Sequence, residues 1–151
     1  MLAILFTAVS MSQVRPDGSD RTMPTLLDKG SHMSDTQTEA VRSLFQTIEG
    51  GIVAGDVNRF SRHFDHQIFV NITSGENGYF SSGQAASLLQ HFLGSRKVVS
   101  FTFSRINDKG PTPYATGRLV SIYRGTLESS QVYVSCSWQQ SRWVIGQFNI
   151  Y

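Results

Sequence analysis

Apolar positions in the first part of residues 34–151 recur at helical intervals. Between Thr36 and Gly55 they form one stripe and predict an amphipathic helix; the stripe consists of Val41, Leu44, Phe45, Ile48 and Ile52. The helix is expected to begin near Ser34 or Thr36, and Thr36 and Glu39 have the spacing of a capping box. The pair Gly55-Asp56 predicts its end. The pair Gly50-Gly51 interrupts the stripe and predicts either a bend or a close approach to a sheet.

The segment after Asp56 mixes short helical and strand patterns. Asp56 is positioned to cap a short second helix that continues through Phe60 and Phe64. Residues 67–72 alternate as a strand, and the turn residues 74–78 follow. A third helix is predicted from a cap at Ser81-Ser82 to Gly94.

The remainder of the chain alternates with a period of two and predicts four long strands. They cover residues 97–106, 114–123, 132–139 and 143–151. Short polar turns separate them, so each strand is expected to lie antiparallel to the one before it. Residues 34–151 are therefore expected to form one α+β domain, in which N-terminal helices pack on a curved antiparallel sheet.

Several short sequence segments resemble those of a known family. They are residues 52–57 (IVAGDV), 60–64 (FSRHF), 78–81 (GYFS), 114–117 (YATG) and 143–150 (WVIGQFNI). Together with the order of the elements, they resemble the nuclear transport factor 2-like cone, also called cystatin-like or SnoaL-like. Within that group the chain resembles the bacterial domain-of-unknown-function 4783 family over about residues 40 to 151.

The resemblance implies a fold and export from the cytoplasm, and it implies no reaction. In the cone fold a long first helix lies in a bent sheet and leaves a funnel-shaped pocket. Related cones include isomerases, dehydratases and polyketide cyclases, and others are binding or assembly modules, so the fold does not choose between these classes.

Composition excludes several classes of function. The net charge is +2 and no run of Lys or Arg occurs, whereas a nucleic-acid binder usually carries a basic stripe. We therefore expect no nucleic-acid partner. The single cysteine, Cys136, excludes an intramolecular disulfide and a cysteine-based zinc cluster, and its place in a strand predicts a buried, inert thiol. No metal and no cofactor are expected.

Residues 1–33 are expected to be a flexible N-terminal segment. Met1 to Ser10 reads MLAILFTAVS, which resembles the tail of a secretory signal peptide without its basic leading region. The run is too short to span a bilayer, so no integral membrane segment is expected. We expect a periplasmic or secreted protein, with the cytoplasm as the alternative.

The candidate catalytic residues are His63, Asp65 and His66. Two imidazoles flanking a carboxylate could transfer a proton or bind a metal, while a polar helix end is the competing interpretation. The four final predicted strands contain no Asp or Glu. A cyclase or isomerase cone often needs such a group facing its cavity, so this absence favours a non-catalytic protein.

The sequence thus predicts a non-catalytic binding or assembly module with an apolar funnel for a small apolar ligand. Its wall is expected to include Phe45, Ile48, Val99, Phe101 and Phe148. Two alternatives stay open. One is a small-molecule isomerase, dehydratase or hydrolase that uses His63, Asp65 or His66. The other is a structural homodimer with a filled pocket, paired through a polar sheet face that carries Tyr133, Ser135, Ser137 and Gln139.

Overall fold

The computed structural model describes residues 33–73 and 75–151. Its elements are α1 (Asp35–Ala54), α2 (Asn58–Ser61), β1 (Phe64–Ile72), β2 (Asn77–Ser81), α3 (Ser82–Gly94), β3 (Lys97–Asn107), β4 (Tyr114–Tyr123), β5 (Thr126–Gln139) and β6 (Arg142–Ile150). The predictions of a flexible segment and of a signal-peptide tail rest on residues 1–32, which lie outside the described residues.

The strands form a six-stranded sheet in the order β2-β1-β6-β5-β4-β3. The strands β3, β4, β5 and β6 pair antiparallel in sequence order, which confirms the predicted meander. β1 then joins the far side of β6 in parallel, and β2 folds back on β1 as a hairpin. β2 was not predicted, because its five residues, Asn77–Ser81, fall between the turn residues and the cap of the third helix and are too few to show a strand pattern.

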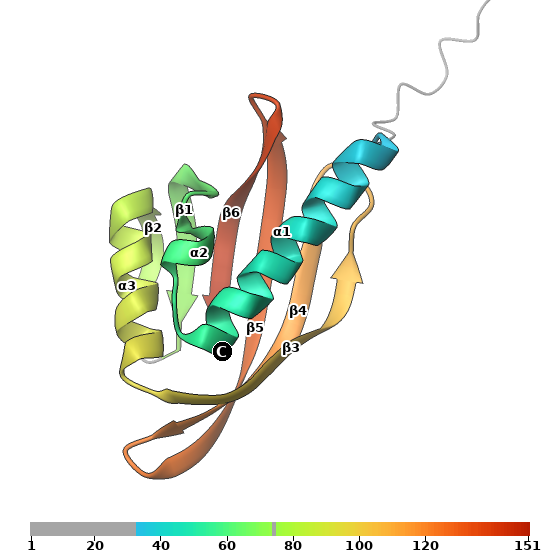
Figure 1. The fold of residues 1–151 in the computed structure, drawn as a ribbon. Coiled ribbons are helices and arrows are strands. Elements are labelled where there is room, and N and C mark those ends of the chain that lie inside the picture. Colours follow the sequence, from blue (N-terminus) through green and yellow to red (C-terminus); the bar gives the residue numbers. More distant parts are fainter. Residues whose placement is uncertain (1–32, 74) are drawn as a thin grey trace, which may run out of the picture.

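The helices lie on one face of the curved sheet. Figure 1 shows α1 running diagonally across this face, with α3 beside β1 and β2. We call it the concave face, and the face turned away from α1 the convex face. The indole nitrogen of Trp143 in β6 donates to the carbonyl oxygen of Gln37 at 2.9 Å and ties the start of α1 to the sheet. Within the described residues, no helix combines the length and apolar character needed to cross a membrane.

Ser34, one of the two predicted starts, is the N-cap of α1, but the predicted capping box was wrong. The capping box consists of Ser34 and Gln37, whose side chains bond to each other's backbone, and Thr36 already lies inside the helix. Ser34 has the extended backbone that an N-cap requires, with φ −66° and ψ 155°. The predicted end is confirmed, since Gly55 closes the helix in the left-handed conformation at φ 65°.

The glycine pair inside α1 marks a close approach, but to a helix rather than to the sheet. A Cβ atom on Gly51 would lie 2.5 Å from Cδ1 of Phe60 in α2, whereas a Cβ on Gly50 would meet nothing within 4 Å. Gly51 therefore lets the ring of Phe60 rest directly against the backbone of α1. Phe64, which was predicted to continue the second helix, begins β1.

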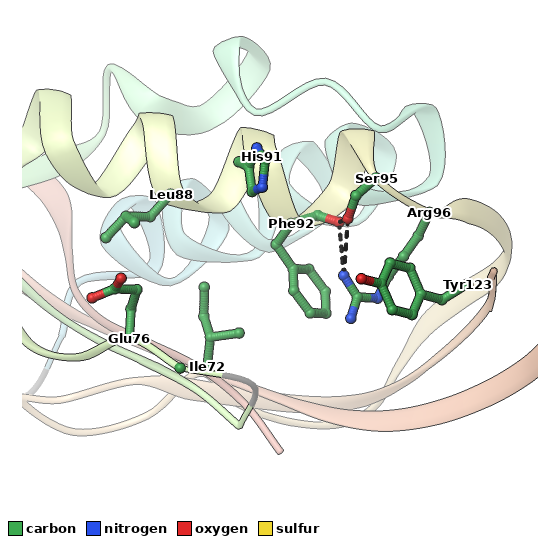
Figure 2. Close-up of a pocket in the computed structure, with 9 residues that line it drawn as sticks. Ile72, Glu76, Leu88, His91, Phe92, Ser95, Arg96 and Tyr123 are labelled. Carbon is green, nitrogen blue, oxygen red and sulfur yellow. Dashed lines mark hydrogen bonds between the residues drawn. The ribbon is translucent and has the colours of Figure 1, made fainter.

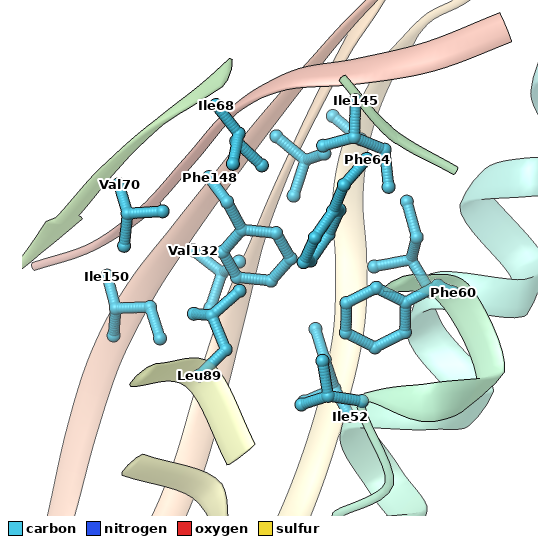
Figure 3. Packing of buried hydrophobic residues seen from close by; sticks show 14 of the residues in the cluster. Ile52, Phe60, Phe64, Ile68, Val70, Leu89, Val132, Ile145, Phe148 and Ile150 are labelled. Carbon is cyan, nitrogen blue, oxygen red and sulfur yellow. The ribbon is translucent and has the colours of Figure 1, made fainter. Parts of the chain in front are cut away.

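Phe60 connects the helical layer to the sheet. Its ring stacks on that of Phe148 in β6 with 5.8 Å between centroids, and it meets Phe64 edge-on at 5.9 Å. Figure 3 shows these rings beside Ile52 of α1 and Leu89 of α3. All five side chains are buried. The interior of the cone is thus an aromatic and aliphatic core to which both long helices and the sheet contribute.

Candidate functional site

Four of the five side chains predicted to line a funnel lie in the hydrophobic core: Phe45, Ile48, Phe101 and Phe148. The ring of Phe45 meets that of Phe103 edge-on at 5.8 Å between centroids. Phe148 is covered by Phe60, as described above. Core side chains thus fill the space between α1 and the sheet at these positions. A ligand at this wall stays a prediction.

The fifth residue, Val99, does not lie on the concave face with Phe101. Its side chain is 52% exposed. The pairing of β3 with β4 passes from Val98 opposite Ser121 to Ser100 opposite Val120, so Val99 is an extra residue in a β-bulge. A bulge reverses the inward and outward alternation, and Val98 packs against the core in its place. The strict alternation assumed from the sequence was wrong at this point.

His63 directly precedes β1, and Asp65 and His66 lie at its start, where both carboxylate oxygens of Asp65 accept hydrogen bonds. One carboxylate oxygen of Asp65 accepts from Nε2 of Gln139 at 2.8 Å, and the other accepts from the backbone N–H of His66 at 2.7 Å. The carbonyl of His63 accepts from the backbone of Ile145 at 2.7 Å. No group of three potential metal ligands occurs among the described residues.

The surroundings of His63 favour the neutral form of its imidazole. Partial burial lowers the pKa of His63 below its ordinary value of 6.5, and the positive charges of Arg62 and Arg142 lower it further. A base with a lowered pKa is a weak proton acceptor at neutral pH. The thiol of Cys136 is buried as predicted, and its burial raises the pKa of Cys136 to about 12, so the thiolate does not form under physiological conditions.

An open groove lies beside α3, where the sequence predicted no site. It consists of two adjoining cavities of about 320 Å³ and 560 Å³ that share Glu76, Leu88 and His91. The first also has Phe92, Arg96 and Tyr123 in its wall, and the second has Phe80 and Ser87. Each reaches the size at which ordinary ligand sites begin, which is about 300 Å³.

Arg96 is the fixed charged group of this groove. Figure 2 shows its guanidinium below the last turn of α3, between the side chains of Phe92 and Tyr123. The guanidinium carbon lies 3.7 Å from the centroid of the Phe92 ring and 4.4 Å from that of Tyr123. Nη1 donates to the carbonyl of Phe92 and to the hydroxyl of Ser95, both at 3.1 Å.

The local sequence explains why an arginine is held here. α3 ends at Gly94 with Ser95 as its C-cap, so Arg96 follows the exposed carbonyls of the last turn. A cation is favoured at that helix end because it complements both the free carbonyls and the helix dipole. Nε of Arg96 also lies 3.7 Å from Oε2 of Glu128 in β5. The Arg96 side chain is only 10% exposed and cannot change conformation freely.

Arg96 was not among the site residues predicted from the sequence. His91, an exposed residue of α3, lies in the wall of both cavities. The helix end at Gly94 was predicted, and a basic residue just beyond a helix end is a usable signal. The rings of Phe92 and Tyr123 that confine Arg96 come from different elements, so spacing along the chain could not bring them together.

The chain belongs to the family described as a domain of unknown function (DUF4783), which it matches over residues 45–151. No curated protein sequence matches it. Among solved structures, it is similar to a DUF4783 family protein from Bacteroides uniformis with a TM-score of 0.63 and 16% identity, covering 70% of this chain and 93% of that one. A second, from Bacteroides fragilis, has a TM-score of 0.60 and 15% identity, covering 69% and 93%.

The fold extends beyond this family. An NTF2-like protein of unknown function from Pseudomonas putida is similar with a TM-score of 0.57 and 11% identity, covering 78% of this chain and 87% of that one. A protein with a cystatin-like fold from Nostoc punctiforme has a TM-score of 0.60 and 10% identity. At these identities the likeness shows the fold alone, and it confirms the predicted cone.

Proposed function

We propose that this protein is a non-catalytic binding module whose ligand occupies the groove beside α3. One observation carries the proposal: a nearly buried and immobilised Arg96 lies at one end of two adjoining cavities, while aromatic packing fills the interior at the predicted funnel wall. A fixed charge beside an apolar wall is the usual composition of a small-molecule site.

The same geometry argues against the enzymatic alternative. Acid–base catalysis requires a titratable group within reach of the bound molecule and with a pKa suited to the reaction. Within the described residues, the carboxylate of Glu76 and the imidazole of His91 lie in the groove wall, and neither belongs to the predicted catalytic group. Asp65 is bonded to Gln139 and the backbone, and neither His63 nor His66 contributes to either cavity of the groove.

Binding can be located with nuclear magnetic resonance on the full ¹⁵N-labelled chain and a library of small amphipathic compounds. We expect amide signals of Leu88, Phe92 and Tyr123 to shift with the compounds that bind. Leu88→Trp should abolish the shifts because the indole fills the space shared by both cavities. Val53→Trp is the matched control, since Val53 is an exposed residue of α1 outside the groove. Shifts confined to other surfaces would refute the proposal.

A second candidate function, assembly as a homodimer, is favoured by aromatic pairs on the convex face. Phe69 in β1 and Tyr133 in β5 each alternate with buried neighbours and so project from that face. The rings of Phe69 and Tyr79 meet at 5.2 Å, and those of Tyr114 and Tyr133 stack at 5.7 Å. A hollow of about 440 Å³ lies on this face, with Phe69, Tyr79 and Gln147 in its wall.

Sedimentation velocity over a range of protein concentrations tests this assembly. We expect a dimer that Tyr79→Lys converts to a monomer, because a charge at this 72% exposed ring would be buried in the interface. Val53→Lys is the control on a surface away from the sheet. A wild-type chain that stays monomeric at all concentrations would contradict the assembly function and leave the groove unaffected.

We also propose export from the cytoplasm, in line with the apolar run of Met1 to Ser10. Fractionation of cells that express the full chain tests it. A protein recovered entirely in the cytoplasm, at its full length by mass spectrometry, would refute export.

A further inference from the structure

We propose that the groove beside α3 selects a linear amphipathic monocarboxylate, with the carboxylate on Arg96 and the apolar chain toward Phe80. This inference rests on the proposed binding function and adds the chemical class of the ligand. The two cavities differ as such a molecule requires, because only the first contains the positive charge of Arg96 and the wall of the adjoining one is mainly apolar.

The guanidinium of Arg96 has donors left for a ligand. Within the described part of the chain, Nη1 is the donor in both hydrogen bonds of this side chain. Glu128 approaches Nε at 3.7 Å, which is an ion-pair distance but longer than a hydrogen bond. Nε thus already faces a carboxylate, whereas Nη2 makes no hydrogen bond within the described residues. The N–H groups of Nη2 are therefore the donors left for a ligand carboxylate.

The surroundings of Arg96 disfavour a ligand with two negative charges. Glu128 lies next to the guanidinium and Glu76 lies in the wall of both cavities, so two carboxylates already accompany one arginine. A dianion such as a phosphate monoester would meet these two like charges with only one cation to offset them. A monocarboxylate can accept from the free N–H groups of Arg96 at a smaller electrostatic cost than a dianion.

The adjoining cavity accommodates the apolar part of the ligand. Phe80 and Leu88 supply its apolar wall, and Leu88 continues into the cavity of Arg96, so the apolar surface is continuous with the charged end. Both side chains are only partly buried against the core, which leaves surface for a ligand to cover. Contact between an alkyl chain and this surface is favourable because it removes apolar area from water.

Isothermal titration of the full chain with octanoate, decanoate, 1-octanol and octylamine tests the inference. We expect octanoate to bind at least about tenfold more tightly than 1-octanol, which corresponds to about 1.4 kcal/mol. Arg96→Met should abolish this difference. Arg96→Lys should keep part of it, since a lysine keeps the charge but not the planar guanidinium group. Arg118→Met is the matched control, because Arg118 is an exposed arginine outside the groove.

Two further variants are expected to act in the opposite direction. Glu128→Gln and Glu76→Gln each remove a negative charge near the carboxylate site and should tighten octanoate binding severalfold, which a purely structural role of Arg96 would not produce. Ser87→Phe should weaken decanoate more than octanoate, because it narrows the apolar cavity. Thermal denaturation of every variant shows that it is folded.

The inference is overturned if octanoate binds no better than 1-octanol, if no alkyl carboxylate binds, or if Arg96→Met leaves the preference intact in a folded protein. Compounds without a carboxylate that shift the groove signals would then leave the proposed binding function standing. If no compound shifts those signals, the binding function itself fails.

Discussion

The concave side of the sheet contains two regions that differ in how they are filled. Between α1, α2 and the sheet, the rings of Phe45, Phe60 and Phe148 are fully buried, and those of Phe60 and Phe148 stack. Beside α3, the same side of the fold is open, and its wall includes the charged groups of Arg96 and Glu76. Apolar side chains close the first region because contact with one another removes them from water. The second stays open because charged groups keep their hydration unless a partner replaces it.

The largest expected effect comes from removing the ring of Phe60, which lies at the centre of the filled region. Phe60→Ala should lower the free energy of unfolding by about 3–5 kcal/mol, since the stacked ring of Phe148 and the backbone of Gly51 would both lose their partner. Urea denaturation followed by tryptophan fluorescence measures the loss. A change below about 1 kcal/mol would show that the interior is loosely packed and could admit a ligand.

Two neighbouring leucines of α3 allow the filled region and the groove to be compared, because one lies in each. Leu89 is fully buried in the core, so Leu89→Ala should cost about 2–5 kcal/mol of stability. Leu88 lies in the groove wall and is half-buried, so Leu88→Ala should cost about 1 kcal/mol or less while weakening ligand binding. Denaturation and titration of both variants give the two readouts. Equal losses of stability would contradict the open groove.

The adjacent glycines of α1 provide a sharper comparison. Gly51→Ala would place a methyl group 2.5 Å from the ring of Phe60 and should destabilise the protein by about 1–3 kcal/mol. Gly50→Ala meets no neighbour and should stabilise it by up to about 1 kcal/mol through higher helix propensity. Thermal melts of the two variants should therefore shift in opposite directions. Shifts in the same direction would show that the Phe60 ring is free to move away.

The smallest expected effect concerns pH. The pKa of His63 is lowered in the folded state, so the unfolded chain binds a proton at this residue more readily than the folded protein does. The stability that the neutral His63 contributes is therefore fully present above pH 6.5. That contribution declines as the pH falls below 6.5. His63→Gln should flatten the fall in melting temperature between pH 7 and pH 5, whereas His91→Gln is the control. An unchanged pH profile in the His63 variant would show that its burial is relieved by local opening.

The sequence predicted the features that local patterns determine and missed those set by distant contacts. The stripe from Val41 to Ile52 identified α1, and the turns between the last strands predicted their pairing. The extra residue at Val99 was invisible, because a bulge depends on how β3 matches β4 rather than on its own composition. The groove was missed for the same reason, since Tyr123 and Glu128 reach Arg96 only through the folded sheet.

The parallel pairing of β1 with β6 has a consequence for synthesis of the chain. β6 is made after every other described strand, yet it lies in the middle of the sheet between β1 and β5. Until it leaves the ribosome, the hairpin of β1 and β2 and the meander of β3 to β5 each present an unpaired edge, which is a template for aggregation. The sheet therefore cannot be completed until β6 has been synthesised. A chain that stalls or ends before β6 should need a chaperone to prevent aggregation.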